Sequence, residues 1–213
     1  YVTWLSEKSG YQFRLPSEAE WEYAGRAGTT TNYFFGNDTN QLCDFANVFD
    51  QSAEKAFKRD LGVKWKGVNC DDNAEYTTAV GQYKPNSFGL YDMIGNVGEY
   101  VSDCEHRDYI NAPQDGSVWL EDCYDGRWFG FISVSADHDM FIHRGGSYGY
   151  PAWAMSLYVR SHVGKNNTSS MGEGFRIALD SSSQNNKLVA KPLASTQLFL
   201  EELSQIQQVK ESP

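Results

Sequence analysis

The chain opens with hydrophobic residues at helical spacing. Val2 and Leu5 fall on one helical face, and Gly10 stands where a C-terminal cap belongs. This pattern predicts a helix that ends at Gly10. The following segment, YQFRLP, predicts a short strand that Pro16 halts, because proline has no backbone N–H to donate.

A second helix is predicted in the segment PSEAEWEYAGRAG. Ser17 and Glu20 form an S-x-x-E capping box, which marks the start of a helix. Trp21 supplies an apolar position, and Arg26 with Gly28 closes the helix.

After Gly28 the pattern changes, and glycine, asparagine, aspartate and serine recur every few residues between short aromatic pieces. Little helical period remains, so the sequence predicts long ordered loops around a small amount of sheet. Residues 77–83 and 141–148 are each expected to form a short strand. No internal repeat is evident.

The end of the chain has a different composition. Residues 181–191 read as a polar linker, and an apolar stripe at helical spacing follows it. The stripe consists of Phe199, Leu203, Ile206 and Val209. We therefore expect one domain over residues 1–180 and a linker with an amphipathic helix over residues 181–213.

Composition narrows the class of protein. Aromatic residues make up 15% of the chain, as expected of a globular protein rather than a disordered one. The formal net charge of −10 argues against nucleic acid as a partner, because phosphate binding requires clustered Lys and Arg. No apolar run approaches the ~18 residues of a membrane span. The first residues show neither a methionine nor a signal-peptide pattern, so we expect the numbering to begin inside a larger protein.

The four cysteines suit two local disulfides, Cys43–Cys70 and Cys104–Cys123. Three pairings are formally possible, and four buried thiols are the alternative. The disulfides would imply an extracytoplasmic protein, either periplasmic or secreted.

The segment FGLYDMIGNVGEY carries two acids, Asp92 and Glu99. Gly95 and Gly98 lie between them, and helices disfavour glycines so close together. The segment is therefore expected to be a turn that runs into an extended piece. Its acids either hold a cation or only stabilise a bend.

Five motifs in a fixed order resemble the formylglycine-generating enzyme family, also called the sulfatase-modifying-factor domain. They are RLPSEAEWEYAGRAG, FAN, NSFGLYDMIGNVGEY, HRGGSY and GFRIA, and they span Gln12 to Leu179. The resemblance implies an α+β fold related to C-type lectins, with little regular secondary structure and long ordered loops. The family's usual N-terminal strands would lie before Tyr1.

The resemblance also implies calcium in the segment DMIGNVGE. The ligands would be the Asp92 side chain, the Gly95 and Val97 carbonyls and the Glu99 carboxylate. Calcium takes six to eight oxygens and readily mixes carboxylates with carbonyls. In the alternative interpretation, Asp92 caps a turn and Glu99 pairs with an arginine.

A second calcium site is implied where FANVF meets CDDNAEY. Its ligands would be the Asn47 side chain, the Val48 carbonyl, the Asp72 side chain and the Ala74 carbonyl. The Cys43–Cys70 bridge would hold these two segments together beside the ion. Alternatively, the acids form a surface turn, and Asp71 is a possible substitute for Asp72.

The sequence departs from the family pattern in two places. Oxidising members bind copper with two cysteines after the RGGS motif, and here the matching positions are Tyr150 and Met155. A phenol and a thioether cannot replace two thiolates, so formylglycine generation by that route is not expected. Gly98 stands where the family usually has a tryptophan. Either the loss of the indole opens the substrate region, or glycine is needed because Trp153 or Tyr100 fills the space beside it.

Three histidines could suggest other chemistry. His138 and His143 show no standard metal-ligand spacing, and a surface histidine with a partly buried one explains them. Cys104 and His106 resemble a nucleophile and its base, but a disulfide at Cys104 is the plainer account.

Aromatic residues near the RGGS motif predict a recognition surface, because Tyr and Trp bury much area at low entropic cost. The predicted ligand-binding residues are Ser147, Tyr148, Tyr150, Trp153 and Tyr158. The first functional hypothesis is thus a calcium-stabilised, non-catalytic recognition or accessory module that binds a protein, a small molecule or other domains of a larger protein. The alternatives are an oxidoreductase of the same fold with non-cysteine metal chemistry, and a carbohydrate-binding lectin-like protein.

Overall fold

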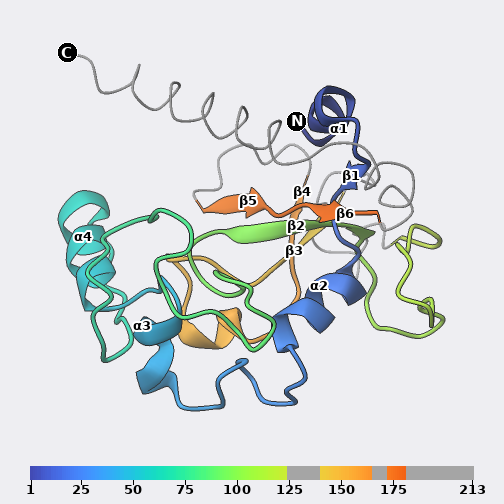
Figure 1. Ribbon diagram of the computed structural model, residues 1–213. Coiled ribbons are helices and arrows are strands. Elements are labelled where there is room, and N and C mark those ends of the chain that lie inside the picture. Colours follow the sequence, from blue (N-terminus) through green and yellow to red (C-terminus); the bar gives the residue numbers. More distant parts are fainter. Residues whose placement is uncertain (124–139, 165–171, 181–213) are drawn as a thin grey trace. The chain divides into compact units, whose positions relative to one another are not determined.

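The computed structural model describes residues 1–123, 140–164 and 172–180 (Figure 1). These residues fall into two compact units, one built from residues 1–14 and 177–180 and the other from residues 15–176. The predicted linker and helix at 181–213, and His138, lie outside the described residues. Within the described part, no helix has the length and apolar character needed to cross a bilayer.

The smaller unit confirms the first predicted helix and strand. Helix α1 (Val2–Ser9) ends at Gly10, whose φ of 74° is the left-handed conformation that glycine adopts without strain. Strand β1 (Phe13–Arg14) pairs antiparallel with β6 (Ala178–Leu179).

Helix α2 (Glu18–Arg26) confirms the predicted capping box. The Ser17 side chain accepts a hydrogen bond from the Glu20 backbone, and the Glu20 carboxylate accepts one from the Ser17 backbone. The helix packs on strands β2 and β3 of the larger unit (Figure 1). Trp21, on this face, is buried in the hydrophobic core.

Helix α4 (Gln51–Leu61) was not expected, because the sequence after Gly28 was interpreted as loops. It follows the short helices η1 (Thr39–Gln41) and α3 (Leu42–Phe45). Asp50 caps its start by accepting the Ser52 and Ala53 N–H groups, and Gly62 ends it in a left-handed conformation. Both caps are visible in the sequence and could have revealed the helix.

The larger unit contains a four-stranded sheet in the order β4-β3-β2-β5. Its strands are β2 (Gly98–Cys104), β3 (Met140–Arg144), β4 (Ser161–Gly164) and β5 (Glu173–Phe175). Strand β2 pairs antiparallel with β3 and parallel with β5, and β3 pairs antiparallel with β4. The short helix η2 (Ala152–Met155) connects β3 to β4 along the chain. The extended piece predicted at the end of the segment FGLYDMIGNVGEY is strand β2, which begins only at Gly98. Gly95 and Asn96 have positive φ values of 72° and 56° and belong to the turn.

The predicted strand over residues 141–148 is only partly correct. Strand β3 ends at Arg144, because Gly145 and Gly146 turn the chain with φ values of 87° and 66°. The predicted strand over residues 77–83 does not form. The Asn96 side chain bonds both backbone groups of Thr78, which leaves that residue no ladder to join.

Both predicted disulfides are present, Cys43–Cys70 and Cys104–Cys123, and no free cysteine remains. The main core lies around Trp21, Leu42, Met93, Ile94 and Leu157. A smaller cluster of Phe49, Ala53, Phe57 and Tyr148 lies on α4 and the loops near it.

His143 fills the space beside Gly98. These residues lie on neighbouring strands, and a Cβ added to Gly98 would come within 2.4 Å of the His143 Nδ1 atom. The steric need at Gly98 is therefore met by His143, and not by Trp153 or Tyr100. His143 is buried, and its burial lowers the pKa of the imidazole below the ordinary value of 6.5.

His143 should therefore contribute a loss of stability as pH drops below 6.5, because the unfolded chain takes up a proton on His143 that the folded chain resists. Replacing His143 by leucine should flatten this acid-side fall, measured by urea unfolding at several pH values. The matched control is His162→Gln. The hydrogen bond to Glu105 raises the His162 pKa, so its removal should steepen the same fall. An unchanged pH profile in His143→Leu would contradict the assignment.

Candidate functional site

The segment predicted to hold the first calcium ion is a tight loop before β2. Asp92 has a left-handed backbone, and its Oδ2 accepts a hydrogen bond from the Gly81 N–H at 2.6 Å. Its Oδ1 is buried without a described partner. Gly95 lies against the backbone of Asn47, whose carbonyl oxygen would be 2.2 Å from an added Cβ. The loop geometry therefore leaves one carboxylate oxygen, on Asp92, for a further donor or cation.

Glu99 has partners that compete with a metal ion. Its carboxylate forms a bidentate ion pair with Arg176, with Nε–Oε2 at 2.5 Å and Nη2–Oε1 at 2.7 Å. The Trp21 indole donates to the same Oε2 at 2.6 Å. Arg176 also donates to the carbonyl of Asp92 at 3.1 Å. A guanidinium thus serves as the cation of this loop, and the carboxylate that a calcium ion would need is already neutralised.

This arrangement is the one described by the alternative interpretation, in which Glu99 pairs with an arginine. The calcium role of Asp92, Gly95, Val97 and Glu99 stays a prediction, and the Glu99 contacts do not favour it. The partner was missed because Arg176 lies 77 residues further along the chain.

The second predicted site brings its four residues together. The Asp72 Oδ2 accepts the Val48 N–H at 2.8 Å, and its Oδ1 accepts the Ala74 N–H at 2.8 Å. Asn47 is fully buried, and its Nδ2 donates to the Tyr76 carbonyl at 2.8 Å. Its Oδ1 has no described partner. A buried amide oxygen without a donor is the group that an oxygen-seeking cation would satisfy.

Asp50 adds a carboxylate that sequence reasoning missed at this site. It is fully buried, and its Oδ2 accepts the Asp72 backbone N–H at 2.5 Å. No Lys or Arg in the described part of the chain pairs with either acid. Burial, with the nearby Asp50 charge adding to it, raises the pKa of Asp72 to about 6. The N-cap position of Asp50 was the available signal, and it was lost with the unpredicted helix α4.

The Cys43–Cys70 bridge lies where it was expected. The Cys43 sulfur is 3.7 Å from the Asp50 Oδ2. Cys70 directly precedes the two adjacent acids Asp71 and Asp72 in the sequence. Asp71 points elsewhere, since its carboxylate is exposed and accepts the Ser52 hydroxyl at 2.7 Å. Asp72 is therefore the better candidate of the two adjacent acids.

The five predicted ligand-binding residues do not share one surface environment. Ser147 and Tyr148 are buried, whereas Trp153 and Tyr158 are exposed by 66% and 54%. Tyr150 is partly buried. Tyr148 makes edge contacts with Phe57 and Tyr76, so much of it belongs to the smaller core.

Tyr148 and Tyr150 line an apolar groove of about 240 Å³. Its other lining residues are Phe57, Leu61, Val63, Trp65 and Gly149. Leu61 and Trp65 are exposed by 49% and 59%, as expected of a surface that can take a ligand. Sequence reasoning missed these residues because α4 and the loop after it were not assigned to this face.

The positions that match the family's copper cysteines differ from each other in burial. Tyr150 lies at the groove, while Met155 is fully buried in the main core. All four cysteines of the chain are in disulfides, which leaves no thiolate for a copper ion in this state.

Comparison with known proteins places this architecture in a family. The chain matches the Sulfatase-modifying factor enzyme 1-like domain over residues 1–181. It is 38% identical over 89 residues to a formylglycine-generating enzyme of Mycobacterium tuberculosis, covering 42% of this chain and 26% of that protein. It is 31% identical over 114 residues to the inactive C-alpha-formylglycine-generating enzyme 2 of Bos taurus, covering 51% of this chain and 33% of that protein. The chain thus spans a third or less of these relatives.

The solved structure of PvdO from Pseudomonas aeruginosa has a similar fold, with a TM-score of 0.62 and 32% sequence identity. The similarity covers 84% of this chain and 57% of that one. Because the family match extends over residues 1–181 and a solved structure agrees with the fold, the chain belongs to the formylglycine-generating enzyme (sulfatase-modifying factor) family.

Proposed function

We propose that this chain is a non-catalytic recognition or accessory module of its family, stabilised by one calcium ion. The observation that carries the proposal is the use of all four cysteines in disulfides. Tyr150 and Met155 stand at the positions of the copper ligands, and neither side chain offers a thiolate. A relative that is named as inactive is consistent with a family member that has lost the oxidase reaction.

Calcium is proposed at the second site, held by the Asn47 side chain, the Val48 carbonyl, the Asp72 carboxylate and the Ala74 carbonyl. The unpartnered Asn47 Oδ1 supports it, as do the buried Asp50 and the half-buried Asp72, neither of which has a basic partner in the described part of the chain. Calcium would supply the charge that the Asp50–Asp72 pair lacks and would fix the loop that carries it. The first site is a weaker proposal, because Arg176 already neutralises Glu99.

Recognition is proposed at the groove lined by Tyr148, Tyr150 and Trp65. Its aromatic walls suit an apolar or aromatic group of a small molecule or of a protein side chain. The two disulfides support an extracytoplasmic, periplasmic or secreted, location.

Protein purified without added metal should contain close to one calcium ion and no copper or iron, by inductively coupled plasma mass spectrometry. Removing calcium with EDTA should lower the melting temperature by roughly 5–10 °C relative to a calcium concentration about 100 times Kd, because calcium binds only the folded state.

The matched variants for this calcium test are Asp72→Asn and Asp71→Asn, which change adjacent acids by the same amount. Asp72→Asn should lose most of the calcium-dependent shift, and Asp71→Asn should keep it. The reverse result would place the ligand on Asp71. Stoichiometric copper or iron would instead support an oxidoreductase with other ligands.

The groove can be tested with the fluorescent probe 8-anilinonaphthalene-1-sulfonate, whose aromatic rings suit apolar walls. Trp65→Ala should weaken its binding at least about fivefold, the loss expected for an important contact residue. Trp153→Ala is the matched control, because Trp153 is exposed and does not line the groove. Weaker binding in Trp153→Ala alone would show that the recognition surface lies elsewhere.

A further inference from the structure

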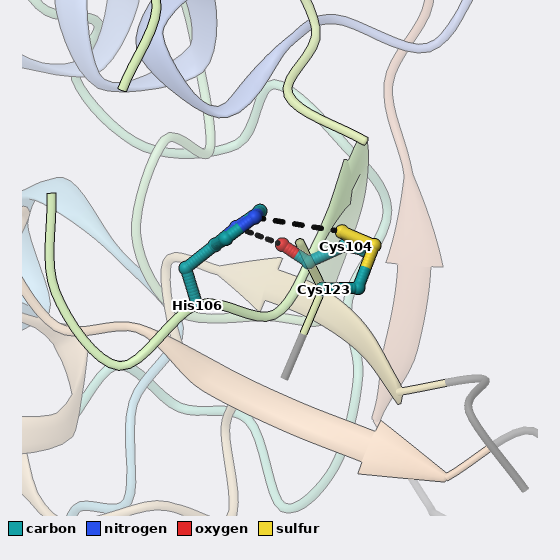
Figure 2. A group of neighbouring side chains, drawn as sticks. All are labelled: Cys104, His106 and Cys123. Carbon is teal, nitrogen blue, oxygen red and sulfur yellow. Dashed lines mark hydrogen bonds between the residues drawn. A yellow bond between two sulfur atoms is a disulfide. The ribbon is translucent and has the colours of Figure 1, made fainter. Parts of the chain in front are cut away.

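A second group of metal-binding side chains lies at the end of strand β2 (Figure 2). It consists of Cys104, His106 and Cys123, and the two sulfur atoms and one imidazole nitrogen lie within 4.8 Å of one another. The two cysteines form a disulfide. The group is separate from the proposed calcium site and uses none of its residues.

The His106 imidazole is held in a fixed position. It stacks on the Trp119 indole with a centroid distance of 3.4 Å and an interplanar angle of 5°. The side chain is 7% exposed. The His106 backbone carbonyl accepts a hydrogen bond from Arg160 at 2.7 Å, which fixes the main chain as well. The ring therefore cannot turn away without losing its stacking contact with Trp119.

Both ring nitrogens of His106 face carbonyl oxygens. The Nδ1 lies 3.1 Å from the Cys104 oxygen, and the Nε2 lies 2.7 Å from the Glu121 oxygen. A neutral imidazole has one N–H and one lone pair, so one carbonyl must face a lone pair. A cation at the second nitrogen, whether a proton or a metal ion, removes this repulsion.

The geometry favours Nε2 as the nitrogen for a metal ion. A metal-binding histidine usually donates its other N–H to a backbone carbonyl or a carboxylate. Here Nδ1–H can donate to the Cys104 oxygen, while Nε2 lies 3.8 Å from the Cys104 sulfur (Figure 2). The Glu121 carbonyl oxygen next to Nε2 can serve as a further ligand to the metal ion.

We propose that reduction of the Cys104–Cys123 disulfide creates a site for a thiophilic cation such as Zn²⁺ or Cu⁺. The ligands are the two thiolates and the His106 Nε2. Such a mixed sulfur and nitrogen set suits these ions. In the disulfide the sulfur atoms are not thiolates and carry no charge, so the oxidised site does not bind the metal ion.

The redox step balances with a dithiol as reductant. The dithiol gives two electrons and two protons and forms its own disulfide, while Cys104 and Cys123 become thiols. The metal ion then binds both sulfurs as thiolates and releases two protons. Both cysteines are partly exposed, so a reductant and an ion can reach the sulfur atoms.

The test uses the full chain reduced with a phosphine, which does not form mixed disulfides. Co²⁺ is the spectroscopic probe, because thiolate-to-cobalt charge transfer distinguishes sulfur ligands from the carboxylates of the calcium site. Reduced protein should take up one equivalent of Co²⁺ with this signal, and Zn²⁺ should displace it. Oxidised protein should show no such signal.

Two variants separate this site from the other disulfide. His106→Gln, checked for folding by near-ultraviolet circular dichroism, should weaken Zn²⁺ binding by more than about tenfold, the lower end of the loss caused by removing even a supporting group. The double variant Cys43→Ser with Cys70→Ser should retain the signal. Equal affinity in His106→Gln, loss of the signal in the Cys43/Cys70 variant, or a reduced chain that binds no ion would overturn the proposal.

Discussion

The buried Trp21 indole joins three elements of the larger unit, and the other contacts of this region are arranged around it. Its Nε1 donates to the Glu99 carboxylate on β2 at 2.6 Å. Its ring lies 5.4 Å from the Arg144 guanidinium at the end of β3. Glu99 and Arg144 are register partners, so one side chain of α2 contacts both strands of a pair. Two buried charges are tolerated here because each also has an ionic partner of its own.

Arginine side chains donate hydrogen bonds to loop carbonyls that, in a helix or a sheet, would be satisfied by backbone N–H groups. Arg144 pairs with Glu22 and donates to the Leu157 and Val159 carbonyls. Arg176 similarly holds the carbonyls of the loop before β2. The five N–H donors of a planar guanidinium can satisfy several loop carbonyls at once. A buried loop carbonyl without a hydrogen-bond donor would destabilise the fold.

The Asp50–Asp72 pair is the exception to this arrangement. Asp50 is fully buried and Asp72 is half-buried, yet no described basic side chain pairs with either acid, in contrast to Glu99. The disulfide beside it fixes the chain but contributes no charge. This difference between two otherwise similar loops is why calcium is proposed at one and not favoured at the other. The proposed function rests on the disulfide-bonded state of all four cysteines and on the aromatic groove.

The sequence by itself determined the features that depend on neighbouring residues. The Ser17 capping box and the Gly10 cap were predictable, because caps need only local spacing. The two local disulfides were the favoured one of three possible pairings, and the structure confirms them. The family motifs also predicted the fold and brought Asn47 near Asp72. Helix α4 is not predicted although Asp50 and Gly62 mark its ends, because the sequence around it has the glycine-rich and polar pattern of loops.

Only the tertiary structure decided the partners of the buried polar groups. It paired Glu99 with Arg176 and gave the space beside Gly98 to His143. It also separated the buried Tyr148 from the exposed Trp153, although both belong to one aromatic stretch of sequence. A buried charge or ring takes whichever complementary group packing brings within contact distance. That group lies far along the chain, so local sequence patterns do not specify it.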